Sequence, residues 1–172
     1  GISNMNTLTL TNSNGATFST SNAITTVAIN DTTDSADVTF TALTATTLTT
    51  ANQGYDMNFY GGVSITNNVT FSNTGTLTIG NNNGLTNNFY AGVLATTQSA
   101  ITIQGMINAN SGNITMGDVT TALGLNHSGA SFGGSTTGNI TLGAVTANVN
   151  GKLIIGSSGG TNTISVASIN GR

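Results

Sequence analysis

The sequence predicts an all-β protein built as a parallel β-solenoid of about seven coils. Three observations favour this fold. Short stretches alternate apolar residues with Thr, clusters of Asn, Gly and Ser separate those stretches, and related segments recur at steps of about 25 residues. In such a fold each strand pairs with the equivalent strands of the coils above and below it, about 4.8 Å away.

The alternating stretches are expected to be short strands with one buried face. The chain contains 34 Thr and 25 Asn but no Glu, and Thr, Asn and Gly are weak helix formers. Alternation with period two is typical of strands, and the flanking Asn, Gly and Ser supply turns. We expect strands at 7–11, 37–43, 63–66, 68–72, 75–80, 100–105, 113–117, 139–143, 152–156 and 163–168.

The clearest repeat is the segment SGNITMGDV at 111–119, which returns as TGNITLGAV at 137–145. Stacking the two copies predicts that Ile114 and Ile140 lie over one another in neighbouring coils. Similar apolar cores elsewhere follow one another at steps of 24, 13, 26 and 13, which indicates coils of two or three strands with insertions. The aligned positions are Leu77, Ile101, Ile114, Ile140 and Leu153.

A second repeat is MNFYGGV at 57–63, which returns as NNFYAGV at 87–93. Because neighbouring side chains of a strand point to opposite faces, Phe59 and Phe89 are predicted in the core and Tyr60 and Tyr90 outside it. We expect the two tyrosines to stack on each other, or to mark a contact patch for a neighbouring subunit or a glycan.

The domain organisation and the fold each leave an alternative. Residues 1–54 are less regular and are expected to form an irregular β cap or an intersubunit strand, whereas residues 55–172 form the solenoid repeats of the same domain. An antiparallel β-sandwich, as in a fibre subunit that donates a strand, is the alternative fold. It also buries one face of short alternating strands.

Charge is scarce along the whole chain. Charged residues make up 4% of the sequence, and the formal net charge is −3. Two basic residues cannot form a phosphate-binding surface, so no nucleic-acid partner is expected. No run of about 18 apolar residues occurs that could span a membrane. A polar surface with so little charge does little to prevent self-association, so we expect a homo-oligomer or filament.

The segments SGNITMGDV, TGNITLGAV and NGKLIIGSSGG resemble the degenerate repeats of bacterial secreted surface adhesins. These are the passenger regions of autotransporters and of filamentous-haemagglutinin-like proteins, and S-layer and extracellular fibre subunits have a similar composition. The resemblance covers about residues 60–172 and identifies no functional residue. It implies a right-handed β-helix, exposure at the cell surface, and adhesive or structural work.

The chain is not expected to be an enzyme. His127 is the only histidine, and the nearest acid in the sequence is Asp118. A catalytic Ser–His pair needs a base that reaches the nucleophile and a third group that orients the base, and no such arrangement is indicated. We therefore predict no catalytic and no cofactor-binding residue.

The densest group of acids is NDTTDSAD at 30–37. Asp31, Asp34 and Asp37 could supply oxygen ligands to Ca²⁺, although their spacing matches neither an EF-hand loop nor the nonapeptide calcium repeat. A solvated turn is the alternative interpretation. Calcium at these three residues is the only metal hypothesis that the sequence supports.

Together these features predict an extracellular structural protein, a subunit or segment of a cell-surface filament, layer or adhesin that self-associates through its ends. A glycan- or host-binding adhesin module is the alternative, with outward Tyr55, Tyr60 and Tyr90 as contact residues. Ice binding is a further alternative, because Thr-x-Thr segments such as 7–9 and 76–78 could form ordered ranks on one face.

Overall fold

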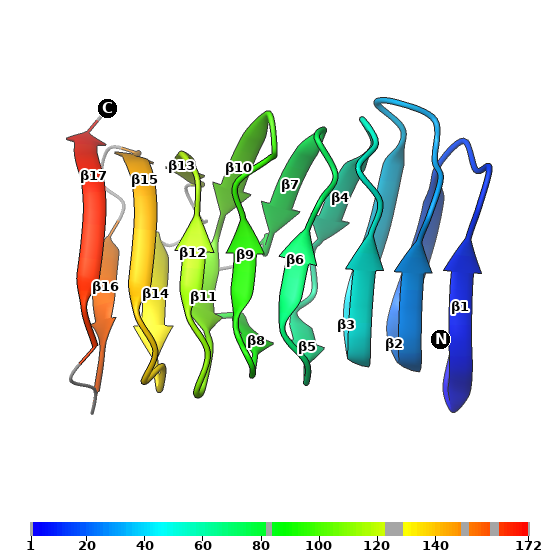
Figure 1. Cartoon of the computed structure of the whole chain (residues 1–172), viewed down its shortest axis with the longest axis horizontal. Helices are drawn as coiled ribbons and strands as arrows, with labels where there is room; N and C mark the ends of the chain where they lie inside the picture. The colour runs from blue at the N-terminus through cyan, green and yellow to red at the C-terminus, as the bar shows by residue number, and fades with distance from the viewer. Residues whose placement is uncertain (1, 82–83, 123–128, 149–151, 159–161, 172) are drawn as a thin grey trace.

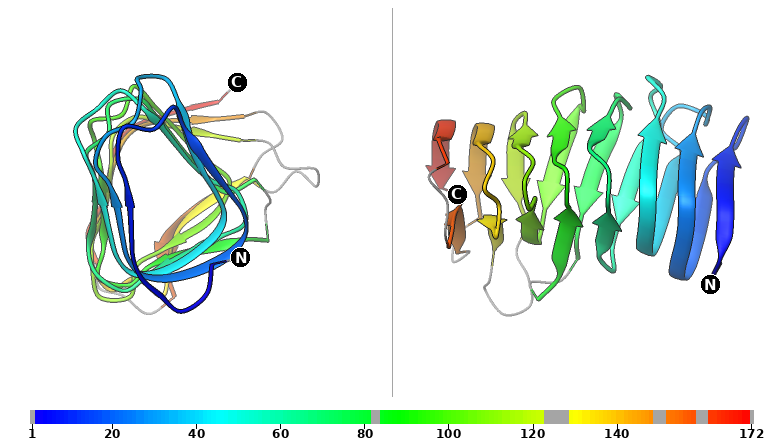
Figure 2. Two further views of the ribbon diagram at one scale, coloured as in Figure 1. Left: turned by 90° about the vertical axis from the view of Figure 1, so that its right-hand side faces the viewer. Right: turned by 60° about the horizontal axis from the view of Figure 1, so that its bottom comes forward.

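A computed structural model describes residues 2–81, 84–122, 129–148, 152–158 and 162–171. Strands stack into a β-solenoid of about seven coils, and the two termini lie at opposite ends of the rod (Figure 1). Seen along the rod axis, the coils have a rounded triangular outline (Figure 2). The described residues contain no helix, and the strand pairs are parallel. The predicted solenoid is confirmed, and the antiparallel sandwich is wrong.

The described residues form 17 strands, most of them three to five residues long. They are β1 (Met5–Leu10), β2 (Ala16–Ile29), β3 (Asp37–Thr50), β4 (Asp56–Phe59), β5 (Val63–Ile65), β6 (Val69–Phe71), β7 (Thr76–Ile79), β8 (Thr86–Phe89), β9 (Val93–Ala95), β10 (Ala100–Ile103), β11 (Gly105–Asn108), β12 (Ile114–Met116), β13 (Val119–Thr121), β14 (Ala130–Gly134), β15 (Ile140–Ala147), β16 (Leu153–Ser157) and β17 (Ile164–Gly171).

Strand pairing divides each coil into three faces, which the chain visits in a constant order. Face 1 contains 16–18 of β2, 37–40 of β3, β4, β7, β10, β13, 144–147 of β15 and 168–171 of β17. Face 2 contains 22–24 of β2, 42–45 of β3, β5, β8, β11, β14 and β16. Face 3 contains 7–10 of β1, 26–29 of β2, 47–50 of β3, β6, β9, β12, 140–142 of β15 and 164–166 of β17.

The register of the predicted repeat is confirmed. Ile114 pairs with Ile140 on face 3, and Leu77 pairs with Ile101 on face 1. The steps of 13 have a different meaning, because Leu153 pairs with Ala130 on face 2 and so belongs to neither column. Coil length varies because the insertions lie at the corners, where no strand pairing fixes the chain length.

The N-terminal region is more regular than expected. We predicted an irregular cap over residues 1–54, but β1, β2 and β3 are the first coils of the same solenoid, and β2 and β3 are the longest strands, with 14 residues each. No Gly and no Pro occur between residues 16 and 53, so no residue of these types ends either strand, and the register between β2 and β3 shifts only between Phe18 and Ser21. These strands therefore bend around the corners without ending.

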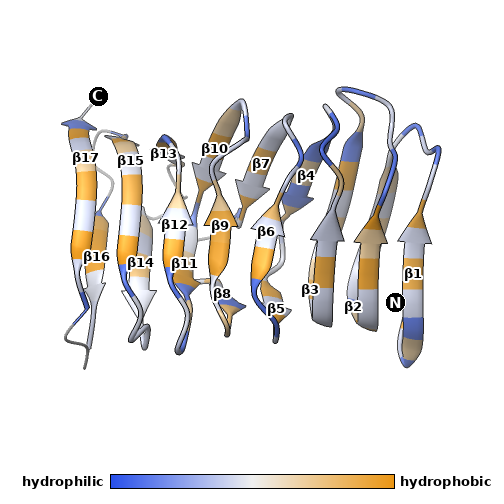
Figure 3. Ribbon diagram, viewed as in Figure 1, coloured by the Kyte–Doolittle hydropathy of each residue, from blue (hydrophilic) through white to orange (hydrophobic). Residues whose placement is uncertain are grey.

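The core runs along the rod axis, and apolar side chains fill it in columns. Bands of apolar residues recur along the strands, as Figure 3 shows by hydropathy. Phe59 and Phe89 are fully buried, as predicted. Five phenylalanines form a continuous series through the first coils, beginning with Phe18 and Phe40, whose ring centroids are 4.6 Å apart. Phe18, Phe40 and Phe59 stack from coil to coil, whereas Phe71 contacts Phe59 and Phe89 edge to face.

Candidate functional site

The carboxylates link one coil to the next. Asp34 Oδ1 accepts a hydrogen bond from the Gly54 backbone N–H at 2.9 Å, and Asp118 Oδ1 accepts one from Ala144 N–H at 2.8 Å. Asp56 Oδ1 accepts one from Thr76 N–H at 2.6 Å. At these three places a carboxylate of one coil thus satisfies a backbone donor of the following coil, which would otherwise need water.

The three candidate calcium ligands each have a different hydrogen-bond partner. Asp34 faces Gly54, whereas Asp37 Oδ1 accepts a hydrogen bond from Asn58 Nδ2 at 2.8 Å. The backbone oxygen of Asp31 accepts a bond from Ser13 N–H. Across the described residues, no three His, Cys, Asp or Glu side chains form a group that could hold a metal ion. The geometry gives Asp34 and Asp37 a cohesive role between coils.

At the corner before face 3, asparagine side chains accept backbone hydrogen bonds from the next coil, as the aspartates do elsewhere. Asn113 Oδ1 accepts from Asn139 N–H at 2.8 Å, and Asn139 Oδ1 accepts from Thr163 N–H at 3.0 Å. This ladder explains why the GNIT motif occurs twice. Sequence reasoning did not assign this role to Asn113 and Asn139, although an Asn directly before Ile-Thr in both copies was the available signal.

The glycines of the same motif permit close approach of the two coils. A Cβ on Gly138 would lie 2.2 Å from the backbone oxygen of Gly112. A Cβ on Gly112 would lie 2.0 Å from the backbone oxygen of Ala91, one coil earlier. Any larger residue at either position would separate the coils and break the corner ladder. The repeat is therefore a stacking motif.

Tyr55 is buried, which corrects the expectation that it points outward. Its side chain is fully inaccessible, and its hydroxyl donates a 3.4 Å hydrogen bond to the backbone oxygen of Ile29. Burial raises the pKa of Tyr55 to about 12, because the charged form would lose its hydration. Tyr55 is thus a core residue and cannot contact a glycan.

Tyr60 and Tyr90 are exposed, as predicted, but they lie at different corners. Tyr60 follows face 1, where its N–H donates to Phe40, and Tyr90 follows face 2, where its N–H donates to Ile65. The two FY segments have the same letters but different places in the coil. The expected stacking of one tyrosine on the other is therefore wrong.

The Thr-x-Thr segments divide between two faces. Thr7 and Thr9 lie on face 3, where they pair with Thr26 and Ala28. Thr76 and Thr78 instead lie on face 1. Ice binding would need these threonine pairs to stack on one face of the solenoid. The two segments do not share a face.

The only histidine of the sequence, His127, lies outside the described residues.

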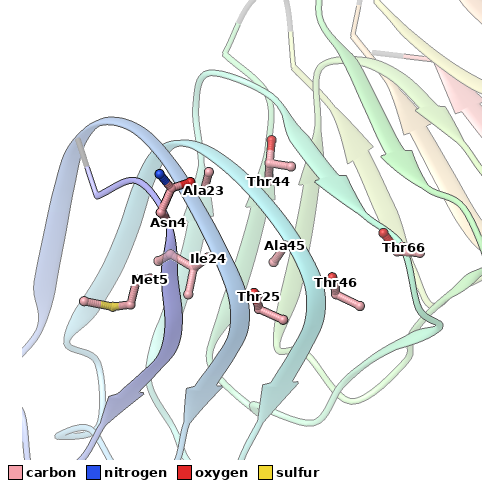
Figure 4. A pocket seen from close by; sticks show the side chains of 9 residues that line it. All are labelled: Asn4, Met5, Ala23, Ile24, Thr25, Thr44, Ala45, Thr46 and Thr66. Carbon is pink, nitrogen blue, oxygen red and sulfur yellow. The ribbon is translucent and has the colours of Figure 1, made fainter.

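A hollow of about 240 Å³ lies where face 2 turns into face 3 near the N-terminus (Figure 4). It is an open depression between the first coils. Its lining is neutral and mostly small, and consists of Asn4, Met5, Ala23, Ile24, Thr25, Thr44, Ala45, Thr46 and Thr66. None of these lining residues is an acid, a base or a thiol.

The last coil carries the most exposed of the large apolar side chains among the described residues. Ile164 is 45% exposed and Ile169 is 59% exposed, although their partners Ile140 and Val145 are fully buried. Both isoleucines continue core columns and lack a following coil among the described residues. Within the described residues, the last coil thus presents a strand edge together with apolar residues of the core columns; this end is called the open end below.

The first coil is open in the same way. Leu8, Leu10 and Phe18 are only partly buried and pack on the core from its end.

No described helix is long and apolar enough to cross a membrane. Comparison with protein-family models, with curated proteins and with solved structures finds no match to this chain.

Proposed function

We propose that this chain is a self-associating structural segment of an extracellular surface assembly, such as a filament, a layer or the rod of an adhesin. The observation that carries the proposal is the uncovered core at the last coil, where Ile164 and Ile169 stand open. Apolar surface of this kind marks an interaction site when it is contiguous and rimmed by polar residues.

The sides of the rod support the same role. Outward positions on face 1 form one column along the rod that consists of six threonines and two asparagines, all at least partly exposed except the buried Asn58. They are Thr17, Thr39, Asn58, Thr78, Thr102, Thr120, Thr146 and Asn170. Neutral hydroxyls and amides suit a spacer in contact with water. Association is expected at the end of the rod, because Ile164 and Ile169 have the highest exposed fractions among the large apolar side chains of the described residues.

Sedimentation velocity from micromolar to millimolar concentration, with negative-stain microscopy, tests the proposal. The wild-type chain should form oligomers or filaments. Ile169→Lys places a charge at the open end and should weaken association about 10- to 100-fold, since burying an isoleucine contributes about 1.5–3 kcal/mol.

Ile154→Lys is the matched control. Ile154 also belongs to the last coil and is 43% exposed, but it points outward from face 2, between the inward Leu153 and Ile155. Its replacement should leave association unchanged. A wild-type chain that stays monomeric at millimolar concentration contradicts the proposal, and so does equal weakening by both variants.

A further inference from the structure

We infer that copies of this chain stack head to tail, with the last coil of one copy against the first coil of the next, so that all three faces continue without a step. The inference rests on the proposed self-association. It names the partner of the open end as a second copy of this chain, and it fixes polarity and register.

The phase of the two ends supports this arrangement. The chain passes from face 1 to face 2 to face 3 in every coil, as β2 shows in a single strand. The described chain begins on face 2, where the backbone oxygen of Ile2 accepts a 2.8 Å hydrogen bond from Ala23 N–H. It ends on face 1, where Gly171 pairs with Ala147. Face 2, which follows face 1 in every coil, is thus the face on which the first described residues lie, so a stacked copy of these described residues would continue the order of the faces.

The core columns give the register on face 3. Ile164 and Val166 end two inward columns, and Leu8 and Leu10 begin them. The column is continuous from β3 to β6, because Ser72 N–H donates to Thr50 Oγ1 at 2.7 Å. Leu8 of the following copy would thus cover Ile164, the residue that the last coil leaves open.

On face 1 the two ends are complementary in size. One column begins with Ala16 and ends with Ile169, and its neighbour begins with Phe18 and ends with Gly171. A large side chain at one end therefore meets a small one at the other in both columns. A head-to-head contact would instead pair the strands antiparallel, unlike the strand pairs within the solenoid.

Disulfide trapping tests the register, because the chain has no cysteine of its own. Thr9 and Ser165 are exposed, outward, and flanked by the inward residues of the same face 3 columns. In the head-to-tail stack Thr9 of one copy lies beside Ser165 of the other, within the Cα separation of about 4.4–6.8 Å that a disulfide accepts. The double variant Thr9→Cys/Ser165→Cys should form a ladder of disulfide-linked multimers under mild oxidation.

Thr17→Cys/Asn170→Cys is a second matched pair on face 1 and should give the same ladder. The out-of-phase pair Thr9→Cys/Asn170→Cys places the thiols on different faces and should give at least tenfold less multimer. Circular dichroism checks that each variant keeps its β structure, since all four positions are exposed.

The outcomes separate the inference from the proposed function. Variants that associate by sedimentation but cross-link no better than the out-of-phase pair overturn the register alone. Efficient dimers from Thr9→Cys alone or Ser165→Cys alone indicate head-to-head or tail-to-tail contacts and overturn the polarity. A chain that never associates overturns the proposed function, and this inference with it.

Discussion

The first and last coils are held together by different interactions. In β2, β3 and β4 successive phenylalanine rings stack, with interplanar angles of 9° and 11°. The same column near the C-terminus contains Thr121, Ala147 and Gly171, and the buried core there is mostly aliphatic, with the corner ladder of Asn113 and Asn139 beside it. One solenoid geometry thus accepts either an aromatic or a mostly aliphatic core. Because each coil contacts only its neighbours, the two regions should respond separately to change.

Removing a ring should produce the largest effect. Phe40 is fully buried between Phe18 and Phe59, so Phe40→Ala is expected to lower the free energy of unfolding by about 3–5 kcal/mol. Val145→Ala, on the same face near the C-terminus, should cost about 2 kcal/mol. Native-state hydrogen exchange, resolved by residue, should show each loss in its own region. Equal losses spread over the whole chain would contradict the separation of the two regions.

The close approach of the GNIT repeats predicts the next effect. Gly138→Ala places a Cβ against the backbone of Gly112 and should destabilise the last coils by about 2–4 kcal/mol. Gly84→Ala is the control, because a Cβ there meets nothing within 4 Å. Chemical denaturation followed by circular dichroism measures both variants. A Gly138→Ala protein as stable as Gly84→Ala would show that the coils can move apart freely.

Alkaline pH should affect the first coils through Tyr55. Its pKa is about 12 in the folded chain and 10.0 in the unfolded reference, so its contribution is complete below pH 10. Between pH 10 and 12 the unfolded chain ionises first, and the free energy of unfolding should fall by about 2–3 kcal/mol. Tyr55→Phe should lack this fall when denaturation is repeated at each pH. The same decline in both proteins would place its cause in other groups.

The smallest effects test whether aspartate and asparagine are interchangeable at the corners. Asp56→Asn and Asp118→Asn retain the oxygen that accepts the next coil's N–H, so each should change stability by about 0.5 kcal/mol or less. Asp56→Ala and Asp118→Ala lose the acceptor and should cost about 1 kcal/mol each. Thermal melts rank the four variants. A large cost for the Asn variants would mean that the negative charge itself matters.

Local pattern was sufficient for some parts of this protein. The alternation of Thr with apolar residues predicted most strands, and the two GNIT copies predicted that Ile114 pairs with Ile140. The pattern also predicted Phe59 and Phe89 in the core. These features depend on two local facts, the pleat of a strand and the turn chemistry of Asn and Gly, which any short window of sequence contains.

Other features were not available to pattern reading. Coil length is not constant, because the step from Ile101 to its partner Val119 is much shorter than the step from Val119 to its next partner, Val145. The two FY segments therefore look equivalent although Tyr60 and Tyr90 lie at different corners. Tyr55 was predicted outward, because its burial depends on coils that lie far away in the sequence.

The sequence by itself determined that the chain forms short parallel strands with neutral polar sides, because alternation and turn residues act over a few positions. Only the tertiary structure decided which strands share a face, which carboxylates join coils, and where the core stays open. Strand pairing sets those relations between positions a whole coil apart, while the corner segments between strands are free to change length. The exposure of Ile164 and Ile169 follows from that pairing, since among the described residues these members of the core columns have a paired strand on one side only.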